Sequence, residues 1–332
     1  VRITDLTTDT PTKIVGADAD GDIGTVNNGE NISLISGALD ANSNAYSLIN
    51  WVARSSTSTT WQSIAYGNGV YVAVAEAGTN RVITSPDGIT WTARSAAEAN
   101  QWYDVVYGGG QFVAVSLTGT NRVMTSPDGV TWTARSASES NQWYSIAYGN
   151  GVYVAVAVSG TNRVMTSTDA ITWTSRSAAE ANLWVSVTYG NSLFVATSID
   201  GTNRVMTSPD GVTWTSRSAA EANAWRGVTY GGGQFVAVAS TGTNRVMTST
   251  NGTTWTARAA AEANSWQNVL YGNGVYVAVA LDGTNRVMTS LDGITWVARL
   301  SPEANQWRDI AYNGRFVGVA MTGTNRVMTS PL

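Results

Sequence analysis

The side chains of this chain that could bind a ligand stand next to a tryptophan that recurs every 41 residues. The residue after this tryptophan differs from repeat to repeat, and six of the seven are aromatic, amide or guanidinium side chains: Gln62, Tyr103, Tyr144, Arg226, Gln267 and Arg308. Arginine and glutamine donate hydrogen bonds to carboxylates and hydroxyls, and tyrosine rings pack against sugar faces. We therefore predict that these six residues contact a ligand, on the face where the repeats vary.

A second group of polar residues is constant from repeat to repeat, and two interpretations of it stay open. In the functional interpretation, Arg81 and Arg94 belong to a ring of donors for carboxylates or sugar hydroxyls. In the structural interpretation, each arginine binds a glutamate such as Glu98 or loop carbonyls, and holds one repeat against the next. These residues stay the same from repeat to repeat while the residues next to them change, which favours the structural interpretation. We assign six residues to it: Arg81, Arg94, Glu98, Asp87, Trp91 and Trp102.

An enzyme would need a catalytic set outside the repeat pattern. Asp104 and Asp309 are acidic residues outside that pattern, but they belong to the second and seventh repeats, with the first repeat between them. The chain has no histidine and no cysteine, which removes the common nucleophile pairs and the usual zinc ligands. We therefore expect no enzymatic activity, no catalytic residue, no cofactor and no metal.

The elements that must position these residues follow from the tryptophans. One series runs from Trp61 to Trp307 and a second from Trp91 to Trp296, both with the 41-residue period, and Trp51 completes the 14 tryptophans. A period of about 40 residues with several short strands is the signature of a β-propeller. We predict an all-β, seven-bladed propeller of four-stranded antiparallel blades.

The first repeat shows the expected strands. Two tight-turn sequences, Gly67-Asn68-Gly69 and Pro86-Asp87-Gly88, separate alternating apolar runs. Valine alternates with tyrosine or alanine, so both strand faces are apolar, as in a sheet packed between two others. The predicted strands are residues 61–66, 70–75, 81–85 and 89–94.

The two ends of the chain predict how the ring closes. The last repeat stops at Leu332, before its fourth strand, whereas residues 49–54 match the fourth strand at 294–299. We predict that an N-terminal strand, 47–54, joins the C-terminal blade and closes the ring, which removes exposed strand edges. The predicted domains are a β-rich leader, 1–45, and the propeller, 46–332.

The turn before the fourth strand resembles the Asp-box of bacterial-neuraminidase-type (BNR) repeats. Residues 85–91, SPDGITW, follow the family pattern Ser-x-Asp-x-Gly-x-Thr-Trp with one residue fewer between Asp and Gly. The resemblance implies the propeller fold and no activity, because in that family the box is a folding element away from the catalytic centre. Sialidases of the family use an arginine cluster and a Tyr–Glu nucleophile pair, and no arginine set is singled out here.

The leader resembles segments of phage tail-fibre and other virion proteins. The resemblance rests on residues 10–18, 23–26 and 31–39, and it implies attachment or oligomerisation. An ordinary hairpin-rich linker is the alternative.

The net charge of −4 gives no basic footprint for nucleic acid, and no apolar run approaches the roughly 20 residues that span a bilayer. We expect a non-enzymatic, extracellular virion protein, a phage tail fibre or surface appendage, whose propeller contacts a host-surface glycan or receptor. Residues 1–45 would bind other virion proteins, and we expect a homo-oligomer, for instance a trimer. Two alternatives stay open: a structural protein that only decorates the virion, and a sialidase-like glycan hydrolase.

Overall fold

The computed structural model describes residues 13–17, 23–27, 50–57 and 59–331. They divide into two units. The first is an antiparallel pair of strands, β1 (Lys13–Ala17) and β2 (Ile23–Asn27). The second is the propeller. The predicted domain boundary between residues 45 and 46 lies outside the described residues and stays a prediction.

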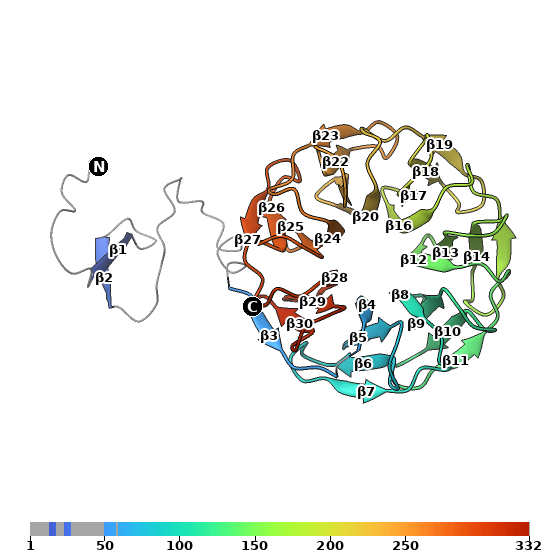
Figure 1. The fold of residues 1–332 in the computed structure, drawn as a ribbon, viewed down its shortest axis with the longest axis horizontal. Coiled ribbons are helices and arrows are strands. Elements are labelled where there is room, and N and C mark those ends of the chain that lie inside the picture. The colour runs from blue at the N-terminus through green and yellow to red at the C-terminus, as the bar shows by residue number, and fades with distance from the viewer. Residues whose placement is uncertain (1–12, 18–22, 28–49, 58, 332) are drawn as a thin grey trace. The chain divides into compact units, whose positions relative to one another are not determined.

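The described part of the propeller contains seven four-stranded antiparallel sheets arranged as a ring (Figure 1). The first blade is formed by β4 (Trp61–Gly67), β5 (Val70–Ala75), β6 (Val82–Ser85) and β7 (Thr92–Arg94), with β4 nearest the axis. The second blade is formed by β8 (Trp102–Gly108), β9 (Gln111–Ser116), β10 (Val123–Ser126) and β11 (Thr133–Arg135). The third is formed by β12 (Trp143–Gly149), β13 (Val152–Ala157), β14 (Val164–Ser167) and β15 (Thr174–Arg176).

The remaining blades repeat this order. The fourth is formed by β16 (Trp184–Gly190), β17 (Leu193–Ser198), β18 (Val205–Ser208) and β19 (Thr215–Arg217). The fifth is formed by β20 (Trp225–Gly231), β21 (Gln234–Ala239), β22 (Val246–Ser249) and β23 (Thr256–Arg258). The sixth is formed by β24 (Trp266–Gly272), β25 (Val275–Ala280), β26 (Val287–Ser290) and β27 (Val297–Arg299). The seventh combines β28 (Trp307–Tyr312), β29 (Phe316–Ala320) and β30 (Val327–Thr329) with β3 (Val52–Arg54).

The predicted all-β, seven-bladed fold is confirmed, but the fourth strands are shorter than predicted. In the first blade the strand begins at Thr92 rather than at residue 89. The carboxylate of Asp87 accepts the backbone N–H groups of Ile89 and Thr90 at 2.8 and 2.9 Å, so these residues complete a turn instead of a strand.

The ring closes between the two ends of the described propeller. Strand β3 pairs with β30, with Val52 opposite Thr329 and Arg54 opposite Val327 (Figure 1). The Arg54 Nε also donates to Thr329 Oγ1 at 3.0 Å. Residues 47–49 of the predicted closing strand lie outside the described residues, and the strand begins at Val52.

The core lies between adjacent blades. Both faces of the second strand are covered, so Val72, Ala73 and Val74 are fully buried. The tryptophan that opens each blade is also fully buried, and the indole N–H of Trp102 donates to the Glu98 carbonyl in the preceding inter-blade loop at 2.9 Å. Burial of such large side chains on both sides of each sheet is the main stabilising contribution to the ring.

Candidate functional site

A β-bulge at the start of each inner strand turns two consecutive side chains toward the axis. In the first blade Trp61 pairs with Ala75, and the next paired residue is Ser63, opposite Val74. The same register shift occurs in the other six blades. The extra residue of a bulge is unpaired and its side chain is redirected. The bulge therefore explains how the varying residue after each tryptophan reaches the centre of the ring.

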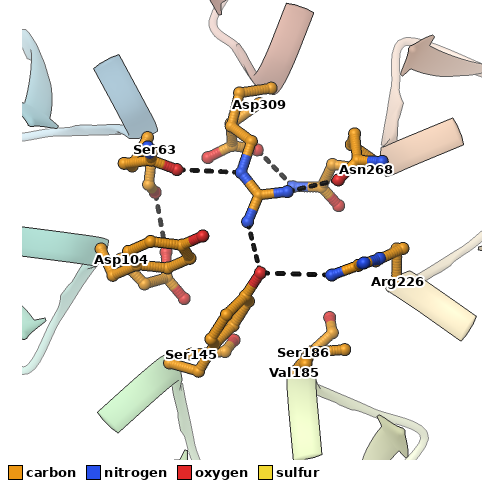
Figure 2. A pocket seen from close by; sticks show the side chains of 13 residues that line it. Ser63, Asp104, Ser145, Val185, Ser186, Arg226, Asn268 and Asp309 are labelled. Atoms are coloured by element: carbon orange, nitrogen blue, oxygen red, sulfur yellow. Dashed lines mark hydrogen bonds between the residues drawn. The ribbon is translucent and has the colours of Figure 1, made fainter. Parts of the chain in front are cut away.

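The side chains from the seven bulges enclose one cavity of about 50 Å³, which we call the axial cavity (Figure 2). Its lining comes from every blade: Gln62, Ser63, Tyr103, Asp104, Tyr144, Ser145, Val185, Ser186, Arg226, Gln267, Asn268, Arg308 and Asp309. All six residues that the sequence predicts as ligand contacts are among them. The structure brings these residues together at the axis rather than spreading them around a rim.

Arg308 crosses the axis and joins four blades. Its Nε donates to Gln62 Oε1 at 3.0 Å and its Nη2 donates to Tyr144 Oη at 2.7 Å, while Nη1 donates to Gln267 Oε1. Its guanidinium carbon lies 5.2 Å from the centroid of the Tyr103 ring, within cation–π range. Burial by itself would lower the pKa of Arg308, but the two tyrosines outweigh it and raise that pKa.

Arg226 points into the axial cavity from the fifth blade, as Figure 2 shows. Its Nη1 lies 3.4 Å from Tyr144 Oη and its Nε lies 3.4 Å from Ser240 Oγ, both at the long end of hydrogen bonding. Its guanidinium therefore keeps donor capacity for a ligand. Gln62 is buried, and its amide oxygen is used by Arg308, while its Nε2 has no hydrogen-bond partner among the described residues.

The two acidic residues outside the repeat pattern, Asp104 and Asp309, both line the axial cavity. Asp104 accepts from Ser63 Oγ at 2.7 Å and from the backbone N–H of Ile146 in the next blade at 2.8 Å. Asp309 accepts from the backbone N–H of Ile64 in the first blade at 2.9 Å. These carboxylates thus link neighbouring blades around the axis.

Burial raises the pKa of both carboxyl groups. The pKa of Asp104 rises to about 6, with the charge of Asp309 adding to burial and the Ser63 and Ile146 hydrogen bonds opposing it. Burial likewise raises the pKa of Asp309 against its hydrogen bonds. With a pKa of about 6, Asp104 can exchange a proton near neutral pH.

Several lining residues were missed in the sequence although a signal for them was present. The second residue after each tryptophan also varies: Ser63, Asp104, Ser145, Ser186, Gly227, Asn268 and Asp309. An alternating strand would place this residue and the preceding one on opposite faces. The bulge, which periodicity does not show, brings most of them to the same cavity.

The constant residues lie between blades and form what we call the inter-blade clamp: Glu98, Asn100 and Asn121 in the second blade and their equivalents in the third to seventh blades. Glu98 Oε1 accepts from Asn121 Nδ2 at 2.6 Å, and Asn100 Nδ2 donates to the Asn121 carbonyl at 2.6 Å. Arg81 Nη1 donates to the carbonyls of Glu76 and Asn100. Arg94 Nε donates to Thr84 Oγ1 at 3.1 Å. These donors are used within the protein.

The other two constant residues assigned to structure lie at or near the Asp87 turn. The indole N–H of Trp91 donates to the Gly88 carbonyl at 3.1 Å, and Ser85 Oγ lies 2.9 Å from Asp87 Oδ1. Backbone hydrogen bonds, above all from Thr90, hold the pKa of Asp87 below its usual value. Among the described residues no group of three or more His, Cys, Asp or Glu could hold a metal ion. Nor does that part of the chain contain a helix long and apolar enough to cross a membrane.

No protein-family model and no curated protein sequence matches the chain. Solved structures of low identity share the fold. A streptogramin B lyase superposes with a TM-score of 0.74 at 14% identity, covering 85% of this chain and 97% of the lyase. A catalytically inactive histidine-to-alanine variant of virginiamycin B lyase from Staphylococcus aureus, solved with quinupristin, gives 0.76 at 12%, covering 86% and 99%. YCF48 bound to D1 peptide gives 0.64 at 14%, covering 89% and 97%.

These similarities correct the expectation that the chain is not an enzyme. That expectation assumed that a ring of similar blades has no room for a unique catalytic set, yet propellers similar to this one are lyases. The assumption also fails within this chain, because the axial cavity does not repeat and both off-pattern acids line it. The likeness shows the fold alone. Since this chain has no histidine, any chemistry in its cavity uses other residues.

Proposed function

We propose that the axial cavity receives the carboxylate of an acidic sugar residue of a host-surface glycan, while the sugar ring, which is too large for a cavity of about 50 Å³, lies outside it. The observation that carries the proposal is the convergence of the six varying residues on one cavity, while the clamp residues repeat around it. A recognition site on a repeat scaffold is expected where the repeats differ. Tyr103 and Tyr144 supply aromatic surface, and the two arginines supply positive charge.

The unused donor capacity of Arg226 indicates that the ligand group is acidic. Arg226 makes only long contacts, to Tyr144 and Ser240. A carboxylate accepts several such N–H donors at once, and paired hydrogen bonds to a guanidinium fix its orientation. A neutral sugar would leave the charge of Arg226 without a partner.

We further propose that the protein acts on the surface of a virion, such as a phage tail fibre or appendage. The support is the resemblance of residues 1–45 to virion segments, which would attach the propeller to other virion proteins and oligomerise it. Several propellers on one particle would strengthen weak binding to a glycan-covered surface. Removal of residues 1–45 is then expected to lower the oligomeric state, measured by light scattering, and to leave the propeller folded.

A glycan array probed with the full chain and with residues 46–332 tests the recognition function. We expect both to bind the same class of acidic glycan. Arg226→Ala should weaken that binding by roughly 10- to 100-fold, since a hydrogen bond to a charged group contributes about 1.5–3 kcal/mol. Gln142→Ala, at an exposed position outside the cavity, is the matched control. If both proteins are folded and neither binds an acidic glycan, the proposal is contradicted.

A second candidate function, protein recognition, is favoured by an apolar surface on the sixth blade. Val297 and Leu300 are 46% and 64% exposed. The first to fifth blades carry threonine at the first position and serine or alanine at the second. Such a surface suits a decorating protein that binds other virion proteins. The double variant Val297→Thr, Leu300→Ser should then reduce incorporation into particles without changing glycan binding.

A further inference from the structure

The geometry points to Tyr144 as a proton acceptor, held as a phenolate between Arg308 and Arg226, that removes a proton from a carboxylate-bearing ligand in the axial cavity. The ligand part rests on the proposed function of the cavity. The charge state of Tyr144 depends only on the protein and can be measured without a ligand.

The first argument is the charge of Arg308. Its guanidinium donates to two amide oxygens and to the Tyr144 hydroxyl, and no carboxylate is among its hydrogen-bond partners in the described part of the chain. The carboxylates of Asp104 and Asp309 are occupied by backbone N–H groups and by neighbouring side chains. A charge withdrawn from water requires a partner of opposite charge. The charge of Asp309 also acts on Arg308, but Asp309 is not among its hydrogen-bond partners. Tyr144 is the acidic group that Arg308 contacts, so its deprotonation places a negative charge directly on this guanidinium.

The second argument is the set of donors around the Tyr144 oxygen. Arg308 donates to it at 2.7 Å and Arg226 at 3.4 Å. The Tyr103 ring lies beside the Tyr144 ring, tilted by 51°, with ring centroids 4.3 Å apart. A phenol offers its own proton as a donor, whereas a phenolate only accepts. Donors that converge on one oxygen therefore stabilise the deprotonated form.

The acid–base properties of the two phenols agree with this assignment. Burial by itself would raise the pKa of Tyr144, but the charges of Arg308 and Arg226 and the hydrogen bond from Arg308 oppose it, and the pKa of Tyr144 is lowered. Burial raises the pKa of Tyr103, which stays protonated. Two neighbouring groups whose pKa values are moved apart are a common arrangement for acid–base chemistry.

The position of Arg226 determines where the ligand carboxylate would lie, and therefore which proton Tyr144 would remove. A ligand carboxylate on this guanidinium would lie next to the Tyr144 oxygen. The C–H bond on the carbon that bears the carboxylate breaks, and the proton bonds to Tyr144 Oη. The electron pair moves into the carboxylate as an enolate, whose negative charge Arg226 stabilises. Uronate sugars carry such a hydrogen, so they are the expected substrate class.

Near-ultraviolet absorption tests the phenolate. At neutral pH the wild-type protein should show the absorption of tyrosinate from one of its 13 tyrosines. Tyr144→Phe should remove this absorption and Arg226→Gln should reduce it, because a stabilising charge is lost. Tyr312→Phe, which removes a hydroxyl away from the cavity, should leave it unchanged. A wild-type spectrum that lacks tyrosinate until alkaline pH would overturn the inference, whatever the glycan array shows.

Deuterium exchange tests the proton transfer. Glucuronate and galacturonate disaccharides incubated in D₂O with the wild-type protein should gain deuterium next to the carboxylate, observed by NMR. Tyr144→Phe should slow this exchange by about 100-fold or more, the usual contribution of a general base. If a bound disaccharide gains no deuterium, Tyr144 is not a proton acceptor. If neither disaccharide binds, uronates are excluded as the substrate class, and the glycan array separately decides the proposed function.

Discussion

The inter-blade clamp and the axial cavity belong to the same blades but follow opposite rules. In the clamp the same contact recurs with the same geometry, and the amide of Asn121, Asn162 or Asn244 donates to a glutamate at 2.6 Å each time. In the axial cavity the equivalent positions of seven blades carry different side chains. Arg308 there contacts Tyr144 from a blade that is not its neighbour.

The constant clamp residues stabilise the ring, whereas the varying residues at the axis form the candidate recognition site. Each clamp serves one interface between neighbouring blades, so a change in one clamp affects only that interface. The interface between the seventh and first blades lacks the clamp, because Thr57 and Thr59 stand where the other interfaces have glutamate and asparagine. At the axis all blades meet, and a residue from one blade can contact residues from several others. A repeat protein can therefore keep its interfaces constant and build one asymmetric site at its centre.

The closing interface offers the strongest test of this comparison, because two chain ends rather than a loop form it. Deletion of residues 46–54 removes β3, which pairs with β30 in the seventh blade. The exposed edge and the missing strand should abolish the single cooperative unfolding transition, measured by tryptophan fluorescence against urea. Deletion of residues 1–45 is the control and should leave the transition intact. An unchanged transition in the 46–54 deletion would mean that closure contributes little.

Asp104 of the axial cavity and Asp128 of the constant turn should respond to pH in opposite directions. The pKa of Asp104 in the folded protein is raised to about 6, so its contribution to stability is complete below about pH 4 and is lost as the pH rises through 6. The loss is on the order of 2 kcal/mol after allowance for partial exposure. Asp104→Asn should remove this pH dependence, measured as the free energy of unfolding between pH 4 and 7.

Asp128 at the constant turn provides the opposite control. Backbone hydrogen bonds, first from Thr131, lower the pKa of Asp128, so the contribution of Asp128 to stability is lost as the pH falls rather than as it rises.

The same pH dependence of stability in Asp104→Asn and in the wild-type protein would show that Asp104 titrates normally.

Equivalent substitutions in different clamps should have equal effects. Asn141 is buried, and its amide donates to the Asn162 carbonyl at 2.6 Å and to Glu139 at 3.1 Å. It also packs against Gly160, where a Cβ atom would lie 1.9 Å from Asn141 Oδ1 at a positive φ of 86°. Replacing Asn141 with alanine leaves buried acceptors unpaired, at a cost of about 1–3 kcal/mol.

The matched variants are Asn182→Ala and Asn223→Ala, whose amides make the same contacts at 2.7 Å. The free energies of unfolding of the three variants should agree within about 0.5 kcal/mol, because the sites are distant and independent. A much larger loss at one of them would mean that the clamps are not equivalent.

The sequence predicted what depends on repetition and missed what depends on one local irregularity. The period of the tryptophans predicted the blades, and the match between residues 49–54 and 294–299 predicted the closing strand. Gln62, Arg226 and Arg308 were identified because they vary. Their convergence could not be predicted, because it depends on the bulge after each tryptophan. The acids were set aside for lying in different blades, although every inner strand reaches the same axis.

A residue that differs between blades can also have arisen by drift, without any role. Thr197 allows a test of this explanation in the core. Its hydroxyl is fully buried and has no hydrogen-bond partner in the part of the chain that the structure describes, whereas the equivalent positions of the other six blades carry valine. Threonine and valine have the same shape, so Thr197→Val removes an unsatisfied group without a cavity and should stabilise the protein by about 1 kcal/mol. Thermal unfolding should shift upward by roughly 2–4 °C, and Val238→Thr in the next blade should lower it. Destabilisation by Thr197→Val would show that this hydroxyl is needed, and that variation in the core, as at the axis, has a role.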